Sequence, residues 1–412
     1  MQGPCSSLTA EILSEIGARG PIPFARFMEI CLYHPRHGYY TRGLGGGGRD
    51  YVTSSGIHGA FGTLVARQVE QMWRKCSRPD PFTFVEFGPG EGRFAEDFLR
   101  AASRSRGFAR ALRYLLVDPS PALRARQRAR LGRRTPVRVE WASPRRLESE
   151  GPFVGCLFAN EVVDAFPVHR LLGTPQGPRE IHVDERDGAL VEVLAPPSTP
   201  SLQRFLDESC IAPEDGQEVD LNLAAPRWMA WAVGLLERGY VLIVDYGYEA
   251  RGLYHPARRR GTLLAYHGHR TGEDFLRNPG EQDLTAHVDF TALARAAERA
   301  GARRLGLVSQ ARFLLALGAL DLWSDPEIPA APESTAVPGD RSRAARLVRA
   351  LREREALKEL ILPQRMGERF QVLVLSAGEA PGDLSGLAAP WEGRPPSGLG
   401  RRTAEADRSA AG

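Results

Sequence analysis

Short apolar runs alternate with stretches of helical periodicity over most of the chain. The apolar runs have the length of buried strands, and turn residues or helical patterns separate each run from the next. The predicted strands lie at 84–87, 113–117, 137–141, 155–159, 240–244 and 370–375. Such alternation is typical of a mostly parallel sheet with helices on both faces, so we expect an α/β fold.

The spacing of these runs predicts one α/β domain with an N-terminal segment before it, two insertions within it and a tail after it. Residues 1–80 contain helical patterns but no strand of the series, and we expect them to form a helical cover over the active site. Residues 81–376 hold the predicted strands, with insertions at about 168–225 and 311–362. Residues 377–412 are rich in Gly, Pro, Ala, Ser and charge, which predicts a disordered tail.

Composition places the chain among soluble globular proteins. Hydrophobic residues make up 42% and charged residues 25%. No apolar run approaches the ~18 residues of a membrane helix, and no secretory signal pattern opens the chain, so we expect no membrane insertion. The five cysteines are scattered without a C-x-x-C pair. This pattern argues against a disulfide scaffold and suits a reducing compartment, so the sequence predicts a cytoplasmic protein.

The charge balance gives little reason to expect a nucleic-acid partner. Of the 54 basic residues only Lys75 and Lys358 are lysine, a skew that fits a GC-rich genome better than nucleic-acid binding. The net charge of +4 is small for 412 residues. The basic stretch at 124–138 is interpreted as a solvated helix face, with a phosphate-binding surface as the alternative.

A glycine-rich turn follows the strand predicted at 84–87. Gly88, Gly90 and Gly92 stand where glycine lets a backbone approach a ligand and where a helix start offers N–H groups to negative charge. A tight connection without a ligand is the alternative. Asp118, at the end of the next strand, could accept both ribose hydroxyls of a nucleoside. The nicotinamide fingerprint needs its third glycine one residue later, whereas this spacing is that of methyltransferases that bind S-adenosylmethionine.

A polar cluster follows the strand at 155–159. Asn160, Glu161 and Asp164 stand at the carboxyl end of that strand, where doubly wound sheets bind ligands. Two carboxylates three residues apart, beside an amide, suit a cationic substrate, and a guanidinium can be held bidentately by carboxylates. In the alternative, Asp164 caps a following helix and only Glu161 faces a ligand.

The histidines are less informative. His267 and His269 have the spacing of metal ligands but no evident carboxylate or cysteine partner, so a loop is favoured and no metal site is predicted. His287 lies between Asp283 and Asp289 at the entry to a predicted helix. A catalytic histidine and a helix-start cluster with Asp289 as the N-cap both remain open. Motifs of serine hydrolases and P-loop proteins do not occur.

Several motifs together resemble those of the MidA-like methyltransferases, a family that includes a mitochondrial complex I assembly factor that methylates a protein arginine. The resemblance runs from about residue 20 to residue 376. The motifs that carry it are His34-Pro35-x-x-Gly38-Tyr39-Tyr40, Asp50-Tyr-Val-Thr53-Ser54, Phe61-Gly62, Glu86-Phe-Gly88-Pro-Gly90-Glu-Gly92, Asn160-Glu161-x-x-Asp164-Ala-x-Pro167-Val-His169, Thr174-Pro-Gln-Gly177-x-Arg179-Glu180, Asp245-Tyr-Gly247, Pro279-Gly280-x-x-Asp283-Leu-Thr285-Ala-x-Val-Asp289-Phe290 and Met366-Gly-Glu-Arg-Phe370.

The resemblance implies a Rossmann-like class I methyltransferase fold, a seven-stranded doubly wound sheet whose last strand is antiparallel at or near the edge. It also implies S-adenosyl-L-methionine as cofactor and, for mitochondrial members, symmetric dimethylation of an arginine on a respiratory complex I subunit. The residues expected to bind the cofactor are Glu86, Gly88, Pro89, Gly90, Gly92, Asp118, Trp141 and Asn160. The residues expected at the methyl-transfer site are Asn160, Glu161 and Asp164, with His287 as the next candidate.

One departure from the family pattern concerns the substrate. After Thr53-Ser54 the family usually has Pro-Glu, whereas this chain has Ser55-Gly56, which removes a carboxylate near the expected cover. A small-molecule methyltransferase and a non-catalytic assembly factor that retains the fold are therefore kept as alternatives to an arginine methyltransferase. The sequence does not indicate an oligomeric state.

Overall fold

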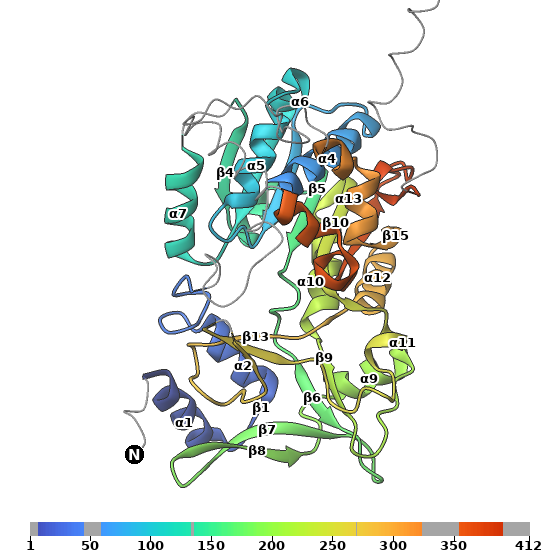
Figure 1. Cartoon of the computed structure of the whole chain (residues 1–412). Coiled ribbons are helices and arrows are strands. Elements are labelled where there is room, and N and C mark those ends of the chain that lie inside the picture. The colour runs from blue at the N-terminus through green and yellow to red at the C-terminus, as the bar shows by residue number, and fades with distance from the viewer. Residues whose placement is uncertain (1–6, 45–58, 133–135, 269, 324–353, 390–412) are drawn as a thin grey trace, which may run out of the picture.

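The computed structural model describes residues 7–44, 59–132, 136–268, 270–323 and 354–389, which form a larger and a smaller lobe (Figure 1). The motif Asp50-Tyr-Val-Thr53-Ser54, the Ser55-Gly56 departure, His269 and residues 324–353 of the predicted 311–362 insertion lie outside these residues. None of the helices among the described residues combines the length and the apolar character needed to cross a membrane.

The larger lobe is built on a mostly parallel sheet. In spatial order its strands are β15 (Arg303–Ser309), β16 (Phe370–Ala377), β10 (Leu236–Tyr248), β5 (Phe153–Asn160), β2 (Phe82–Phe87), β3 (Leu112–Val117) and β4 (Arg138–Ala142). β16 runs antiparallel to both of its neighbours, while β10, β5, β2, β3 and β4 are parallel. A short strand, β14 (Val288–Asp289), pairs with the end of β10. The expected doubly wound fold is confirmed, with the last strand one position in from the edge.

Helices cover both faces of this sheet because its strands are apolar on both sides. Along β2, Phe82 and Phe84 enter one core while Val85 and Phe87 enter the other. The helices of the lobe are α4 (Ala60–Lys75), α5 (Arg93–Ala102), α6 (Arg106–Ala111), α7 (Pro121–Leu131), α8 (Pro144–Glu150), α10 (Ala224–Gly234), α11 (Ala250–Leu253), α12 (Phe290–Arg299), α13 (Gln310–Ala316) and α14 (Ala319–Trp323). The first core contains residues of α4, α5 and α13, and the second contains residues of α10 and α12.

The smaller lobe joins the N-terminal helices to the first predicted insertion. Its elements are α1 (Ser7–Arg19), β1 (Ile22–Pro23), α2 (Phe24–Tyr33), β6 (His169–Leu172), β7 (Arg179–Arg186), β8 (Ala189–Ala195), α9 (Pro200–Ser209), β9 (Glu218–Leu221), β11 (Leu264–His267), β12 (Arg270–Gly272) and β13 (Asp283–Thr285). The strand β1 pairs with β7, so the chain start and the insertion share one sheet.

The N-terminal cover expected over residues 1–80 is divided between the two lobes. Of its described elements, α1, β1 and α2 belong to the smaller lobe, whereas α4 buries Phe61, Leu64 and Val65 in the core of the larger one. Gly62 allows this packing. A Cβ at Gly62 would lie 2.9 Å from the Cβ of Asp97 and 3.0 Å from the backbone nitrogen of Phe98, both on α5.

Residues 377–389 belong to the described structure, so the prediction of disorder from residue 377 is wrong for this stretch. Ala380 and Leu384 are buried in the core beside α4. A short 3₁₀ helix (Ser385–Leu387) follows, and the backbone N–H of Gly386 within it donates to Oε1 of Gln68 at 2.8 Å. Composition did not predict this packing, because the segment as a whole is poor in apolar residues. Two buried apolar side chains and a hydrogen bond to a glutamine of α4 are enough to order it. Residues 390–412 lie outside the described part.

Candidate functional site

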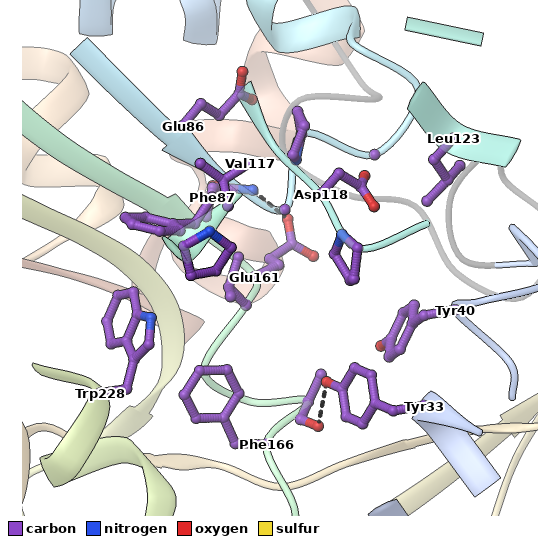
Figure 2. Close-up of a pocket in the computed structure, with 18 of the residues that line it drawn as sticks. Tyr33, Tyr40, Glu86, Phe87, Val117, Asp118, Leu123, Glu161, Phe166 and Trp228 are labelled. Carbon is purple, nitrogen blue, oxygen red and sulfur yellow. Dashed lines mark hydrogen bonds between the residues drawn. The ribbon is translucent and has the colours of Figure 1, made fainter. Parts of the chain in front are cut away.

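A cavity of about 910 Å³ opens at the carboxyl ends of β2, β3 and β5, on the side facing the smaller lobe (Figure 2). This is where doubly wound sheets bind ligands, and the volume is that of a small-molecule site. Of the predicted site residues, the cavity is lined by Glu86, Gly88, Pro89, Gly90, Asp118, Asn160 and Glu161. Gly92, Trp141, Asp164 and His287 are not among its lining residues.

The glycine turn brings bare backbone to the cavity. Gly88, Gly90 and Gly92 have φ values of 61°, 52° and 79°, which favour glycine at all three positions. A Cβ at Gly88 would lie 2.8 Å from Cγ2 of Val162, whereas one at Gly90 would meet nothing within 4 Å. Gly90 thus leaves open space for a ligand, and Gly92 instead serves as the N-cap of α5.

Asp118 is held at the end of β3 by a hydrogen-bonded chain. Its Oδ1 accepts from the backbone N–H of Ser120 at 2.8 Å, and its Oδ2 accepts from Nε2 of Gln127 at 2.9 Å. The Oε1 of Gln127 accepts in turn from Nε1 of Trp141 at 2.9 Å. Trp141 was expected to contact the cofactor, but it supports Gln127 behind the wall. Burial raises the pKa of Asp118, against these hydrogen bonds.

Glu86 is a buried carboxyl group at the back of the cavity. Its Oε2 accepts from the hydroxyl of Tyr114 at 2.7 Å. Burial raises the pKa of Glu86 to about 8, which outweighs the hydrogen bond from Tyr114. The group therefore holds a proton at neutral pH, unless a nearby cation favours its charged form.

Glu161 stands in a strained turn immediately after β5. Its φ of 53° lies in the left-handed region, which is rare for a residue with a side chain and recurs at functional sites. Asn160 donates from Nδ2 to Oε1 of Glu161 at 3.1 Å. The amide oxygen Oδ1 of Asn160 is buried without a hydrogen-bond partner among the described residues. A buried acceptor without a donor is costly, so this oxygen suits a donor supplied by a ligand.

Asp245, near the end of β10, holds this turn in place through hydrogen bonds to its backbone. Its Oδ2 accepts from the backbone N–H groups of Val162, Val163 and Asp164 at 3.3, 3.1 and 3.3 Å. Its Oδ1 accepts from the N–H of Tyr246 at 2.9 Å. Burial, followed by the charges of Asp164 and Glu161, raises the pKa of Asp245. The sequence showed Asp245 only as part of a family motif and did not indicate this role.

Asp164 differs from both expectations. It is buried under the cavity, where its Oδ2 accepts from the hydroxyl of Tyr246, while Oδ1 has no partner among the described residues. Burial raises its pKa to about 6. A turn leading to β6 follows it in place of a helix, so it is not a helix cap. The backbone direction set by Asp245 presents Glu161 to the cavity and turns Asp164 inward.

His287 lines a second cavity of about 450 Å³, which is a different one from that of Glu161. Its ring packs edge-on against Tyr246, with centroids 5.4 Å apart. Burial, with smaller contributions from Arg258 and Arg369, lowers its pKa to about 4. Asp289 accepts from the N–H of Ala292 at 3.0 Å as the N-cap of α12. The helix-start interpretation of this segment therefore describes Asp289. His287 is separated from the cavity of Glu161, although Tyr246, which its ring contacts, donates to Asp164.

Aromatic side chains that the sequence analysis did not select as site residues form the rest of the wall. Trp228 on α10 packs edge-on against Phe87 and Phe166, with centroids 5.4 and 5.8 Å away. Tyr33 ends α2 and Tyr40 follows it in the smaller lobe. Of Trp228, Tyr33 and Tyr40, the sequence analysis named only Tyr40, as part of the family motif near the N-terminus. All three lie far along the chain from the strand ends, so sequence spacing could not predict that they share one cavity with them.

The residues present fit S-adenosyl-L-methionine. Glu86, Asp118 and Glu161 place three carboxyl groups around one cavity, which suits a cationic ligand that carries ribose hydroxyls. Open space at Gly90 and the unpartnered amide oxygen of Asn160 offer an approach for backbone contact and an acceptor. Over the described ranges, no three His, Cys, Asp or Glu side chains are grouped to hold a metal ion.

Comparison with known proteins gives consistent matches. Residues 64–308 match the model of an S-adenosyl-L-methionine-dependent methyltransferase family. The chain is 30% identical over 404 residues to the mitochondrial protein arginine methyltransferase NDUFAF7 homolog of Drosophila melanogaster, covering 90% of this chain and 85% of the relative. The Mus musculus protein arginine methyltransferase NDUFAF7, also mitochondrial, is 30% identical over 399 residues, with 88% and 83% covered.

Two crystal structures from Burkholderia thailandensis have the same fold over nearly the whole chain. One, bound to S-adenosyl-homocysteine, is 34% identical with a TM-score of 0.80 and covers 94% of this chain and 97% of its own. The other, a native structure, is 33% identical with a TM-score of 0.78 and the same coverage. The prediction of a cytoplasmic protein is contradicted, because the arginine methyltransferase relatives are described as mitochondrial. That prediction depended on the scattered cysteines, which indicate a reducing environment but do not identify the compartment.

Proposed function

Since this chain belongs to the MidA-like family of S-adenosyl-L-methionine-dependent methyltransferases, we propose that it transfers methyl groups to an arginine side chain of a protein. Relatives at about 30% identity over most of the chain bear the name of protein arginine methyltransferases, which supports this acceptor. Symmetric dimethylation and a respiratory complex I subunit as the substrate are finer proposals that rest on the family resemblance.

The glycine turn and Asp118 are proposed to hold the cofactor. Gly88, Pro89 and Gly90 present backbone to its amino-acid part, and Asp118 accepts from its ribose hydroxyls. Glu86 and Asn160 supply a carboxyl group and an amide oxygen to the cationic end. When bound, S-adenosyl-L-methionine supplies an activated methyl group on a sulfonium.

Glu161 is proposed to hold the acceptor guanidinium. Arginine is a poor nucleophile because its positive charge is delocalised and its pKa exceeds 12. A carboxylate beside the guanidinium draws that charge toward the nitrogens it contacts, which leaves a lone pair on the nitrogen that faces the methyl group. It also stabilises the extra positive charge that develops during transfer, until the methylated nitrogen loses a proton. The observation that carries the proposal is that Glu161, in a strained turn, shares one cavity with the glycine turn.

Mass spectrometry of protein arginine methylation tests this function. Cells that lack the gene are compared with cells that express the wild-type protein and with cells that express Glu161→Gln. We expect at least one peptide to lose dimethylarginine on deletion, and only the wild-type protein to restore it. A deletion that leaves every arginine peptide unchanged would contradict the proposal.

A small-molecule acceptor is the second candidate, because much of the cavity wall is aromatic. Phe87, Phe166, Trp228 and Trp231 line one side of it, which suits an apolar substrate. Labelled methyl groups from the cofactor, recovered in the small-molecule fraction of a cell extract and absent from protein, would favour this candidate over protein arginine.

A further inference from the structure

Two tyrosines of the smaller lobe face the strand ends across the cavity. Tyr33 and Tyr40 both line the cavity that contains Glu161. Figure 2 shows their rings next to each other on the side away from Glu86, with Glu161 between. Within the described part of the smaller lobe, these two residues line the cavity.

Each ring is fixed through its hydroxyl group. The hydroxyl of Tyr33 donates to the carbonyl oxygen of Ala165 at 2.9 Å, four residues after Glu161. The hydroxyl of Tyr40 donates to Oδ1 of Asp283 at 2.7 Å. The ring centroids are 5.6 Å apart with an interplanar angle of 30°. The two rings therefore form a preorganised wall, and little side-chain freedom remains to be lost when a ligand binds.

The surroundings of this wall favour a cation. Burial, followed by the charges of Asp283 and Asp164, raises the pKa of Tyr33, so its phenol stays neutral. Asp283 and Asp164 thus act on Tyr33 as negative charges, and Glu161 adds a further carboxyl group in the same cavity. Aromatic ring faces also attract cations, by an amount that grows when water is excluded.

We propose that Tyr33 and Tyr40 form the aromatic wall of the acceptor subsite and select the flat guanidinium of arginine over the ammonium of lysine. This inference rests on the proposed function. A guanidinium is planar and weakly hydrated, so it can stack on a ring while its edge meets a carboxylate such as that of Glu161. A lysine ammonium is compact and strongly hydrated, and it loses more by leaving water.

Calorimetry with two matched probes tests the selection. One probe is adenosine whose 5′ position carries a short alkyl chain ending in a guanidine, and the other ends in a primary amine. We expect the wild-type protein to bind the guanidine probe at least tenfold more tightly. Tyr33→Leu and Tyr40→Leu should reduce that preference below threefold, with S-adenosyl-homocysteine affinity within twofold of wild type.

Two further variants separate the ring from the hydroxyl and from general effects. Tyr33→Phe keeps the ring face and should keep the preference for guanidine. Tyr248→Leu, at a half-exposed tyrosine outside this cavity, should behave as wild type. Circular dichroism spectra that match wild type establish that the leucine variants are folded.

The possible contradictions point to different parts of the account. A wild-type protein without a preference for guanidine would overturn the arginine function itself. A wild-type preference that both leucine variants retain would overturn only the aromatic subsite. Leucine variants that lose affinity for S-adenosyl-homocysteine would assign the rings to the cofactor and also overturn the subsite.

Discussion

The carboxylate of Asp245 accepts a hydrogen bond from the backbone N–H of Val163 at 3.1 Å, and this contact fixes the turn that carries Glu161. The N–H groups on either side of Val163 reach the same oxygen. A single side chain in the last part of β10 thereby sets the backbone direction at the end of the neighbouring strand β5.

Replacing Asp245 tests this arrangement. Asp245→Asn would turn an amide N–H₂ toward N–H donors or leave some of them unpaired, each at a cost of about 1–3 kcal/mol. We expect urea unfolding to show a loss of that order or more. Asp187→Asn is the control, because Asp187 lies in the exposed β7–β8 turn with a φ of 53° that asparagine also adopts. An Asp245→Asn protein as stable as this control would show that the turn needs no carboxylate.

Cofactor affinity should depend on Asp118. Its carboxylate faces the cavity and is proposed to accept from ribose hydroxyls, so Asp118→Ala should weaken S-adenosyl-homocysteine binding by roughly 1.5–3 kcal/mol, or about 10–150-fold. Calorimetry measures this directly. Asp207→Ala, at an exposed site on α9, should bind as wild type. Unchanged affinity in the Asp118 variant would remove Asp118 from the cofactor site.

Glu86 should make the ligand-free protein less stable as the pH rises. Its pKa of about 8 lies above the ordinary value of 4.5, so between these values the folded state holds a proton that the unfolded state has lost. Stability then falls by up to about 1.4 kcal/mol per pH unit from pH 4.5 to 8. Glu86→Gln keeps an acceptor for Tyr114 and should flatten the fall in melting temperature over this range.

A second buried carboxyl gives this pH experiment an internal comparison. The pKa of Asp164 is raised only to about 6, so its own contribution to the slope lies below pH 6, and Asp164→Asn should remove that contribution. A difference in melting temperature between Glu86→Gln and wild type that stays constant from pH 5 to 8 would mean that Glu86 does not titrate in this range.

The segment after β16 should contribute measurably to stability. Leu384 is 4% exposed in the core beside α4, so Leu384→Ala should cost about 2–5 kcal/mol in urea unfolding. Leu194→Ala, where the side chain is 48% exposed, should change stability by less than about 0.5 kcal/mol. Equal effects of the two substitutions would show that the segment does not dock in solution.

The central sheet could be predicted because its information is local. Buried strands of one sheet are continuous apolar runs, and the glycine turn and Asp118 stand directly at strand ends. Glu161 was predicted in the same way. These residues needed only the rule that ligands bind at the carboxyl ends of parallel strands.

The remaining walls depend on contacts that no local pattern encodes. Tyr33 meets Ala165 from more than 130 positions away in the chain, and Trp228 comes from the helix that precedes β10. Asp164 carries the same charge as Glu161, but the hydrogen bonds of Asp245 turn it inward. The supporting role of Trp141 could not be predicted either, because its hydrogen-bond partner Gln127 lies on a helix whose sequence is mainly basic. Sequence spacing does not give these orientations.

The most direct test of the whole account is the rate of methyl transfer by Glu161→Gln. Glutamine keeps the size and the hydrogen bond from Asn160 but removes the charge that localises the positive charge of the guanidinium. Transfer of labelled methyl groups to the arginine-containing protein identified by mass spectrometry is measured beside S-adenosyl-homocysteine affinity. Glu91→Gln is the control, since Glu91 lines the same cavity but pairs with Arg126 and Arg130.

For Glu161→Gln we predict a fall in transfer of at least 100-fold, about 2.7 kcal/mol of transition-state stabilisation, with cofactor affinity near wild type. The Glu91→Gln protein should retain most of its rate. Transfer at the wild-type rate by Glu161→Gln would contradict the role given to this carboxylate, and with it the account of how the site acts on arginine.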